Sequence, residues 1–130
     1  MSLLIILIKI LVLSCSAIDL AMTAIYIKSY LKYQPNMKID RIEKNILIRK
    51  LIKKWGLDAG LIWSSVFIWL LVYFIVLITN WMIWIAFIII YSYTIFNHTK
   101  NMKILKRLKE KFPKGFKEIK TKKGMRLVSK

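Results

Sequence analysis

The chain has few of the residues that build reactive or cross-linked sites. It contains one cysteine, Cys15, which can form no intramolecular disulfide, and one histidine, His98. One cysteine and one histidine cannot supply the four ligands of a structural zinc site. Glycine and proline are scarce, and the sequence contains no Gly-rich phosphate loop, His-Glu-x-x-His motif or Ser/His/Asp arrangement. We therefore predict no catalytic residue, no metal site and no cofactor, and an enzyme is not expected.

Acidic residues are also rare. Six Asp and Glu stand against 23 Lys and Arg, which gives a formal net charge of +17, yet 58% of the 130 residues are hydrophobic. That hydrophobic fraction is too high for an ordinary soluble domain. The charges are segregated: residues 28–58 carry +6, residues 98–130 carry +11, and elsewhere only Lys9 and Asp19 are charged. This pattern predicts a membrane protein with basic segments outside the lipid.

The apolar runs are long enough for three transmembrane helices. Residues 59–97 contain no charged side chain, and one helix of that length would measure about 58 Å, against about 30 Å for the hydrocarbon core. Two spans that turn at Thr79-Asn80 fit better. The first span lies within residues 1–27; a cleaved signal peptide is the alternative, disfavoured because no basic region precedes the apolar run. The predicted fold is all-α, with three transmembrane helices and interfacial amphipathic helices.

The basic segments also predict the orientation in the cell membrane. Residues 28–58 follow one span and residues 98–130 follow three, so both lie on the same side, and positive charge favours the cytoplasm. The amino terminus is then outside and the carboxyl terminus inside. Apolar residues at helical spacing predict amphipathic helices at about 39–55 and about 101–112. Beyond Gly115 the chain is polar, basic and poor in apolar residues, and we predict that it is disordered when alone.

One acidic residue falls inside the first span. Ser16 lies about one turn before Asp19, and Thr23 lies one turn after it, so the three form a polar stripe on one helix face. A carboxylate within a membrane span is costly and usually faces a helix interface or a wet cavity. Two interpretations stay open: a hydrogen-bonding contact with a neighbouring helix, or a site for a proton, an ion or a substrate.

A second polar cluster lies near the expected membrane surface. Glu43 and Asn45 would approach Asp19 or Thr23 if the amphipathic helix folded back toward the first span. Carboxylate and amide oxygens hold cations, so this pair is a candidate cation or contact cluster. The alternative is that Glu43 pairs with a neighbouring cation such as Lys44 on a solvated face.

The tail after residue 98 carries the highest density of positive charge. Near a membrane each Lys or Arg attracts anionic lipid by about 1 kcal/mol, so we expect the tail to lie against anionic headgroups of the inner leaflet. Only Phe112 and Phe116 are aromatic there, too few for a binder that stacks nucleic-acid bases specifically. Contact with the ribosome or an acidic partner protein stays an alternative. The residues expected to supply this attraction are Lys103, Lys106, Arg107, Lys109, Lys111 and Lys114.

The order of these polar residues resembles that of a known family, small uncharacterised multi-span membrane proteins of prokaryotes, chiefly archaea. The residues that carry the similarity are Asp19, Thr23, Glu43-Lys44-Asn45 and Trp55-Gly56, followed by the apolar hairpin. The family pattern has an Asp and a Thr one turn apart and then Glu-x-Asn-Pro, whereas here Ile46 takes the place of the proline. The similarity covers about residues 16–75 and implies a membrane fold but no activity.

Three functions are consistent with the sequence. The first is an accessory or structural subunit of a larger membrane assembly, which packs against other membrane subunits or against copies of itself. The second is a homo-oligomeric conduit that passes a proton or a cation along Asp19 and Thr23. The third and most distant is a metal-dependent intramembrane enzyme that uses Asp19, Glu43 and Asn45. The lack of catalytic groups and the long uncharged hairpin favour the first.

Overall fold

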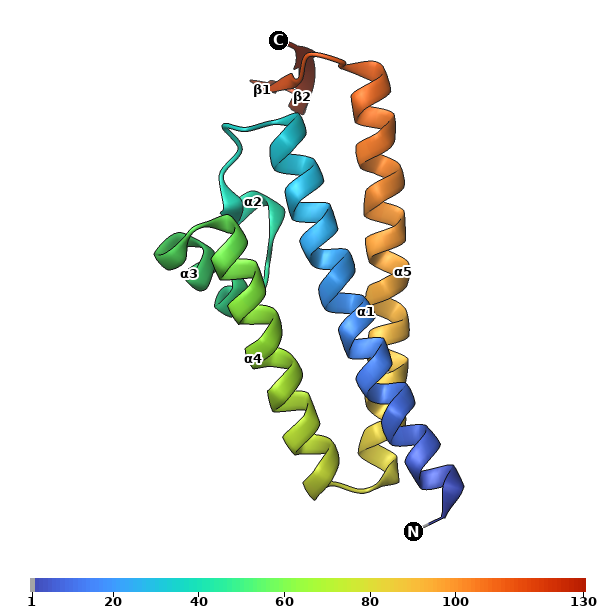
Figure 1. The fold of residues 1–130 in the computed structure, drawn as a ribbon. Coiled ribbons are helices and arrows are strands. Elements are labelled where there is room, and N and C mark those ends of the chain that lie inside the picture. The colour runs from blue at the N-terminus through green and yellow to red at the C-terminus, as the bar shows by residue number, and fades with distance from the viewer. Residues whose placement is uncertain (1) are drawn as a thin grey trace.

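The computed structural model describes residues 2–130, which form a mostly helical molecule with one small sheet (Figure 1). The elements, in chain order, are α1 (Leu3–Tyr33), α2 (Ile39–Ile42), α3 (Ile46–Trp55), α4 (Leu57–Ile78), α5 (Trp81–Lys111), β1 (Phe116–Thr121) and β2 (Gly124–Ser129). Helices α1, α4 and α5 are long and apolar enough to cross a membrane. The prediction of three such helices is confirmed, and the all-α class is corrected by the presence of the sheet.

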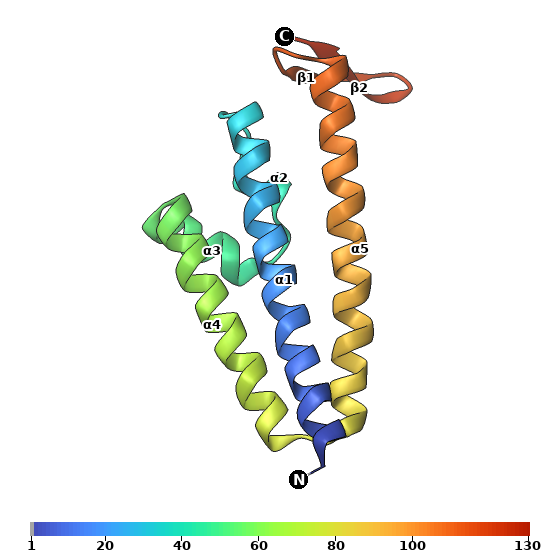
Figure 2. The ribbon, with the colours of Figure 1, turned by 45° about the vertical axis from the view of Figure 1, so that its right-hand side comes forward.

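Helix α1 lies between the other two long helices. It packs along both α4 and α5, and Figures 1 and 2 show it in the middle of the three. The two arms of the hairpin, α4 and α5, spread apart around α1 and meet beside their turn, where Trp84 Nε1 donates to the Val76 carbonyl at 3.1 Å. We call the end of the molecule at Thr79 and Asn80 the turn end, and the opposite end the basic end.

Two separate apolar cores hold the helices together. The core at the turn end joins all three long helices through Val12, Val76 and Trp84, and the Lys9 ammonium lies 5.0 Å from the centroid of the Trp84 ring. The core toward the basic end packs Ile27 of α1 against α3 and α4. Polar side chains of α1 lie between these two cores, which is where the candidate site forms.

The amphipathic segment predicted at about 39–55 is two helices rather than one. The chain breaks at Glu43–Asn45, where the Asn45 side chain accepts hydrogen bonds from the backbone N–H groups of Leu47 at 3.0 Å and Ile48 at 3.3 Å. An asparagine at this position satisfies the free N–H groups that begin a helix. Asn45 therefore starts α3 and separates it from α2, and the Glu43–Asn45 loop turns toward α1.

Helix α3 packs closely against α4 through a glycine. A Cβ atom added to Gly60 would lie 2.5 Å from the Cα of Ile52, far inside van der Waals contact. The turn between the two helices is made at Gly56, whose φ of +89° lies in the left-handed region. These two glycines allow α3 to fold back directly onto the start of α4.

The last helix continues further than the sequence indicates. The separate helix predicted at about 101–112 is instead the end of α5, because no glycine or proline interrupts the chain between Trp81 and Lys111. Helix α5 ends at Lys111, two residues before Pro113, since proline cannot continue a helix.

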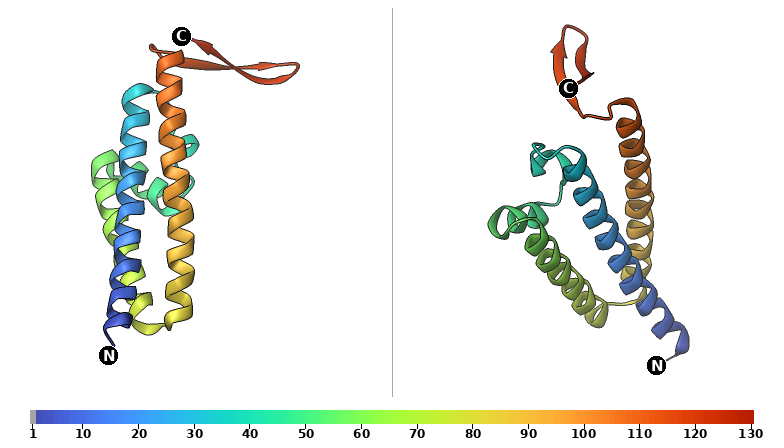
Figure 3. Two further views of the ribbon diagram at one scale, coloured as in Figure 1. Left: turned by 90° about the vertical axis from the view of Figure 1, so that its right-hand side faces the viewer. Right: turned by 45° about the horizontal axis from the view of Figure 1, so that its top comes forward.

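The predicted disorder beyond Gly115 is wrong for this structure. Strands β1 and β2 form an antiparallel hairpin, which projects sideways at the basic end (Figure 3). The turn between the strands places Gly124 at a φ of +115°. Side chains from elsewhere hold the hairpin: the Gln34 side chain accepts from the Phe116 N–H at 3.3 Å, and Arg41 pairs with Glu118. These long-range contacts are invisible in the local sequence.

Candidate functional site

The polar stripe of α1 meets a histidine of α5. His98 Nε2 lies 3.0 Å from a carboxylate oxygen of Asp19 and 3.0 Å from the Thr23 hydroxyl. The side chains of Asp19 and His98 are less than one-fifth exposed, and Thr23 is buried. Ser16, the third member of the stripe, is fully buried one turn closer to the turn end. The stripe therefore faces the interior of the chain, against α5.

The hydrogen bonds of Thr23 favour the His98 tautomer with a proton on Nε2. The Thr23 hydroxyl donates to the backbone carbonyl of Asp19 at 2.9 Å, so its oxygen is left to accept from the His98 Nε2–H. The approach of Nε2 to Asp19 Oδ1 is close but not aligned, and this oxygen and His98 Nδ1 make no hydrogen bond within residues 2–130. Asp19 and Thr23 both contact the same ring nitrogen, so the group is not a Ser/His/Asp-type relay, in which acid and nucleophile occupy opposite nitrogens.

The two predicted polar clusters line one cavity. It has a volume of about 570 Å³ and lies between α1, α5 and the Glu43–Asn45 loop. Asp19 and Thr23 contribute from α1, Glu43 and Asn45 from the loop, and His98 from α5. The other polar residues that line it are Tyr26, Lys44, Tyr91, Thr94, Asn97 and Asn101. The fold thus brings together residues that sequence reasoning placed in two separate groups.

His98 is the main residue of the site that sequence reasoning missed. The signal was available: α1 and α5 both run from the turn end to the basic end, and Asp19 lies 16 residues beyond Leu3 while His98 lies 17 residues beyond Trp81. At about 1.5 Å per residue, both side chains are about 25 Å from the start of their helices. Counting residues from the turn end along each helix therefore places Asp19 and His98 at the same depth.

The basic residues predicted to attract anionic groups lie outside this cavity. Those of α5 and the residues just after it are all exposed and form no ion pair within the described part of the chain. They occupy the part of α5 nearest the hairpin: Lys103, Lys106, Arg107, Lys109, Lys111 and Lys114. They are free to face a membrane surface or another anionic partner.

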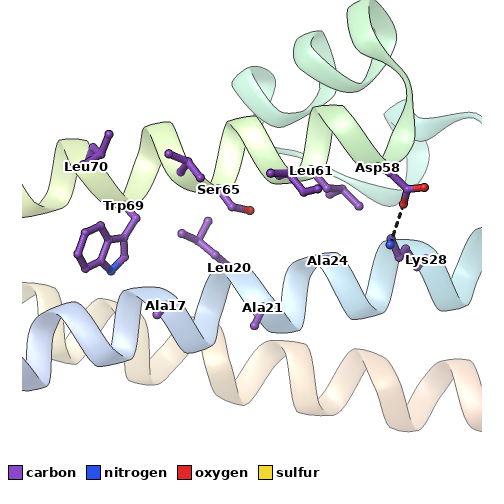
Figure 4. A pocket seen from close by; sticks show the side chains of 12 residues that line it. Ala17, Leu20, Ala21, Ala24, Lys28, Asp58, Leu61, Ser65, Trp69 and Leu70 are labelled. Atoms are coloured by element: carbon purple, nitrogen blue, oxygen red, sulfur yellow. Dashed lines mark ion pairs between the residues drawn. The ribbon is translucent and has the colours of Figure 1, made fainter.

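A second concave surface, the α1–α4 groove, lies between α1 and α4 (Figure 4), on a different side of α1 from the polar cavity, with Leu20 lining both. It has a volume of about 650 Å³ and is lined almost entirely by carbon. Ala17, Ala21 and Ala24 of α1 form one wall, and larger side chains of α4, among them Trp69, form the other. The Lys28–Asp58 ion pair, at 2.7 Å, lies at the end of the groove nearest the basic end.

Comparison with protein-family models, with curated proteins and with solved structures finds no match to this chain. The family resemblance carried by Asp19, Thr23 and the Glu43–Asn45 segment stays an expectation. Within residues 2–130, no group of three His, Cys, Asp or Glu side chains is placed to hold a metal ion. The chemistry available to the site is therefore that of two carboxylates, one imidazole, one lysine and neutral hydrogen-bonding groups around a cavity.

Proposed function

We propose that the protein is an accessory subunit of a larger membrane assembly, and that a transmembrane helix of a partner protein occupies the α1–α4 groove. The observation that carries this proposal is the shape of that groove. Its α1 wall contains Ala17, Ala21 and Ala24, which lie on one face of the helix, with Leu20 beside them and Lys28 at the end. Small side chains at this spacing let two helix backbones approach closely, which is how helices associate within lipid.

Two further features favour a helix over a lipid chain as the occupant. Ser65 of α4 lines the groove, and its hydroxyl offers a hydrogen bond to another helix, which an acyl chain cannot make. Lys28 and Asp58 close one end with a pair of side chains that are 55% and 76% exposed. Such a pair is weak and can exchange with charged residues that flank a partner helix at the membrane surface.

We place the basic end in the cytoplasm and the amino terminus outside the cell. Helix α4 has 22 residues, so its length of about 33 Å matches the hydrocarbon core. With α4 as the measure of the membrane, the end of α5 and the β1–β2 hairpin lie beyond one surface, and α3 lies beside the first turns of α4, at the level of that surface. The exposed cations of α5 then face anionic headgroups of the inner leaflet, with the ribosome as the alternative anionic partner.

The conduit alternative has less support from the geometry. A homo-oligomeric conduit would place Asp19 and Thr23 on an outer face shared between copies, whereas both residues face α5 of their own chain. The apolar core around Val12, Val76 and Trp84 also fills the space between the polar cavity and the turn end. A proton or cation that entered the cavity would meet this core.

The test is copurification of the full-length protein from its native membranes in mild detergent, followed by native mass spectrometry. The tagged wild-type chain should retain defined partner chains. Ala21→Leu, which fills the groove from an exposed position, should lose them, and Ala86→Leu, the same change at an exposed position of α5 outside the groove, should keep them. A lone monomer contradicts the proposal, and a closed homo-oligomer replaces it with the conduit alternative.

A further inference from the structure

Carboxylates in this chain have an excess of cations to pair with. Asp40 pairs with Lys53, Asp58 with Lys28, and Glu118 with Arg41. The three carboxylates without a Lys or Arg partner within residues 2–130 are Asp19, Glu43 and Glu110.

Two of these three carboxylates, Asp19 and Glu43, line the same cavity. They belong to segments that are distant in sequence, and among the described residues that line the cavity the one Lys or Arg is Lys44, which forms no ion pair with either carboxylate. His98 contacts Asp19 but is not a permanent cation. Two carboxylates against one lysine make this cavity negative within a strongly positive molecule, which favours a cationic ligand.

The size of the cavity argues against a bare metal ion. A volume of about 570 Å³ is in the range of sites for small organic molecules, about 300 to 1,000 Å³. A tightly held ion also needs several close ligands, and Asp19 and His98 have no third His, Cys, Asp or Glu side chain placed with them in the described chain. A small organic cation fits both the volume and the charge.

The hydrogen-bonding groups define that cation further. Asp19 lines the cavity, and its Oδ1 atom accepts no hydrogen bond from residues 2–130, so the carboxylate has acceptor capacity left for a ligand. Asn97 and Asn101 offer further acceptors along the wall, and Tyr26 and Tyr91 offer aromatic surface. A primary ammonium group carries three N–H donors and a positive charge that aromatic faces attract. A quaternary ammonium has no N–H and leaves the Asp19 oxygen unsatisfied.

We propose that this cavity binds the primary ammonium group of a small amine, carried either by a lipid headgroup or by a soluble molecule. Asp19 accepts a hydrogen bond from the ammonium, and Glu43 contributes a second negative charge. Lys44, which also lines the cavity, is placed to attract a phosphate attached to the same ligand. This proposal does not depend on the partner helix in the α1–α4 groove, because the two surfaces lie on different sides of α1.

The test uses the full-length protein with two probes. The first is native mass spectrometry of the protein equilibrated with equal amounts of phosphatidylethanolamine, phosphatidylcholine and phosphatidylglycerol in detergent micelles. The second is calorimetric titration with ethanolamine. The variants are Asp19→Asn and Glu43→Gln, which remove charge and keep shape. Glu110→Gln is the matched control, because Glu110 also lacks a Lys or Arg partner in the described chain but lies outside the cavity. Circular dichroism checks that each variant is folded.

We expect the wild type and the Glu110→Gln control to retain phosphatidylethanolamine over both other lipids. Asp19→Asn should weaken this preference at least about tenfold, the loss expected for a hydrogen bond to a charged group, and Glu43→Gln should weaken it in the same direction. Ethanolamine binding without lipid preference assigns the site to a soluble amine. If neither probe binds to the folded protein, the proposal is overturned. Equal retention of phosphatidylethanolamine by Asp19→Asn and Glu110→Gln also overturns it.

Discussion

His98 of α5 contacts Asp19 of α1 through its Nε2 atom, 3.0 Å from the carboxylate, and this contact joins two of the three long helices. Replacement of His98 by leucine leaves the carboxylate and the Thr23 hydroxyl without their neighbour. We expect the free energy of unfolding to fall by about 1–3 kcal/mol, measured by circular dichroism in detergent. Lys100→Leu, at an exposed position of α5, is the control and should change stability little. Equal stability of the two variants would contradict the prediction.

Gly60 allows α3 to pack against α4, and Gly60→Ala should therefore separate them. The added Cβ would lie 2.5 Å from the backbone of Ile52, a clash that no side-chain rotation relieves. We expect a loss of stability of about 1–3 kcal/mol, typical of an overpacked contact, and faster amide hydrogen exchange in α3. Gly124→Ala serves as the comparison, because that position has open space around it and a φ of +115°. Its effect should be confined to the β1–β2 hairpin.

The Asp40 carboxyl links α2 to α3 and makes this contact sensitive to acid. The pKa of Asp40 lies below its ordinary value of 3.8, first because Lys53 donates a hydrogen bond to the carboxylate and then because of the charges of Lys53 and Arg49. A lowered pKa in the folded state means that the stabilisation is complete above pH 3.8 and is lost as the pH falls through the lower, folded value.

An NMR titration of the Asp40 side chain measures this shift directly. Lys53→Met should move the pKa of Asp40 back toward 3.8, because the Lys53 ammonium is 2.7 Å from the carboxylate. Lys54→Met removes the neighbouring charge, which forms no ion pair in the described chain, and should leave the shift in place. If both substitutions raise the Asp40 pKa equally, the prediction is contradicted. The lowered pKa would then come from the surrounding positive charge rather than from the hydrogen bond of Lys53.

The proposed orientation can be tested with single cysteines. In a Cys15→Ser background, Asn80→Cys marks the turn end and Lys123→Cys marks the hairpin. We expect a membrane-impermeant maleimide added to intact cells to label Asn80→Cys and to label Lys123→Cys only after the membrane is permeabilised. The reverse result would place the basic end outside the cell.

The long helices were predictable because their signals are local. The uncharged run of residues 59–97 and the break at Thr79-Asn80 depend on composition and on the thickness of a bilayer, and both can be read along the chain. The packing order was not predictable in the same way. Nothing in the sequence of α4 or α5 states that α1 separates them, because that arrangement depends on which apolar faces fit together in three dimensions.

The hairpin and the cavity show why the remaining features escaped sequence reasoning. Residues 116–129 have the composition of a disordered tail, and their order depends on Gln34 and Arg41, which lie far away in the chain. Asp19 was found because a carboxylate inside an apolar run is conspicuous. His98 was passed over because it follows the run and looks like the start of a polar tail, although its depth along α5 matches that of Asp19.

The central position of α1 also has a consequence for how the protein is made. Helix α1 precedes both flanking arms in the chain, so the arms are synthesised after it. The hairpin of α4 and α5 must therefore open around a helix that is already in the membrane, and its arms cannot reach their final places by closing on each other. A truncated chain that begins after α1 would lack the helix on which both arms pack, so we expect such a chain to hold the hairpin arms less firmly.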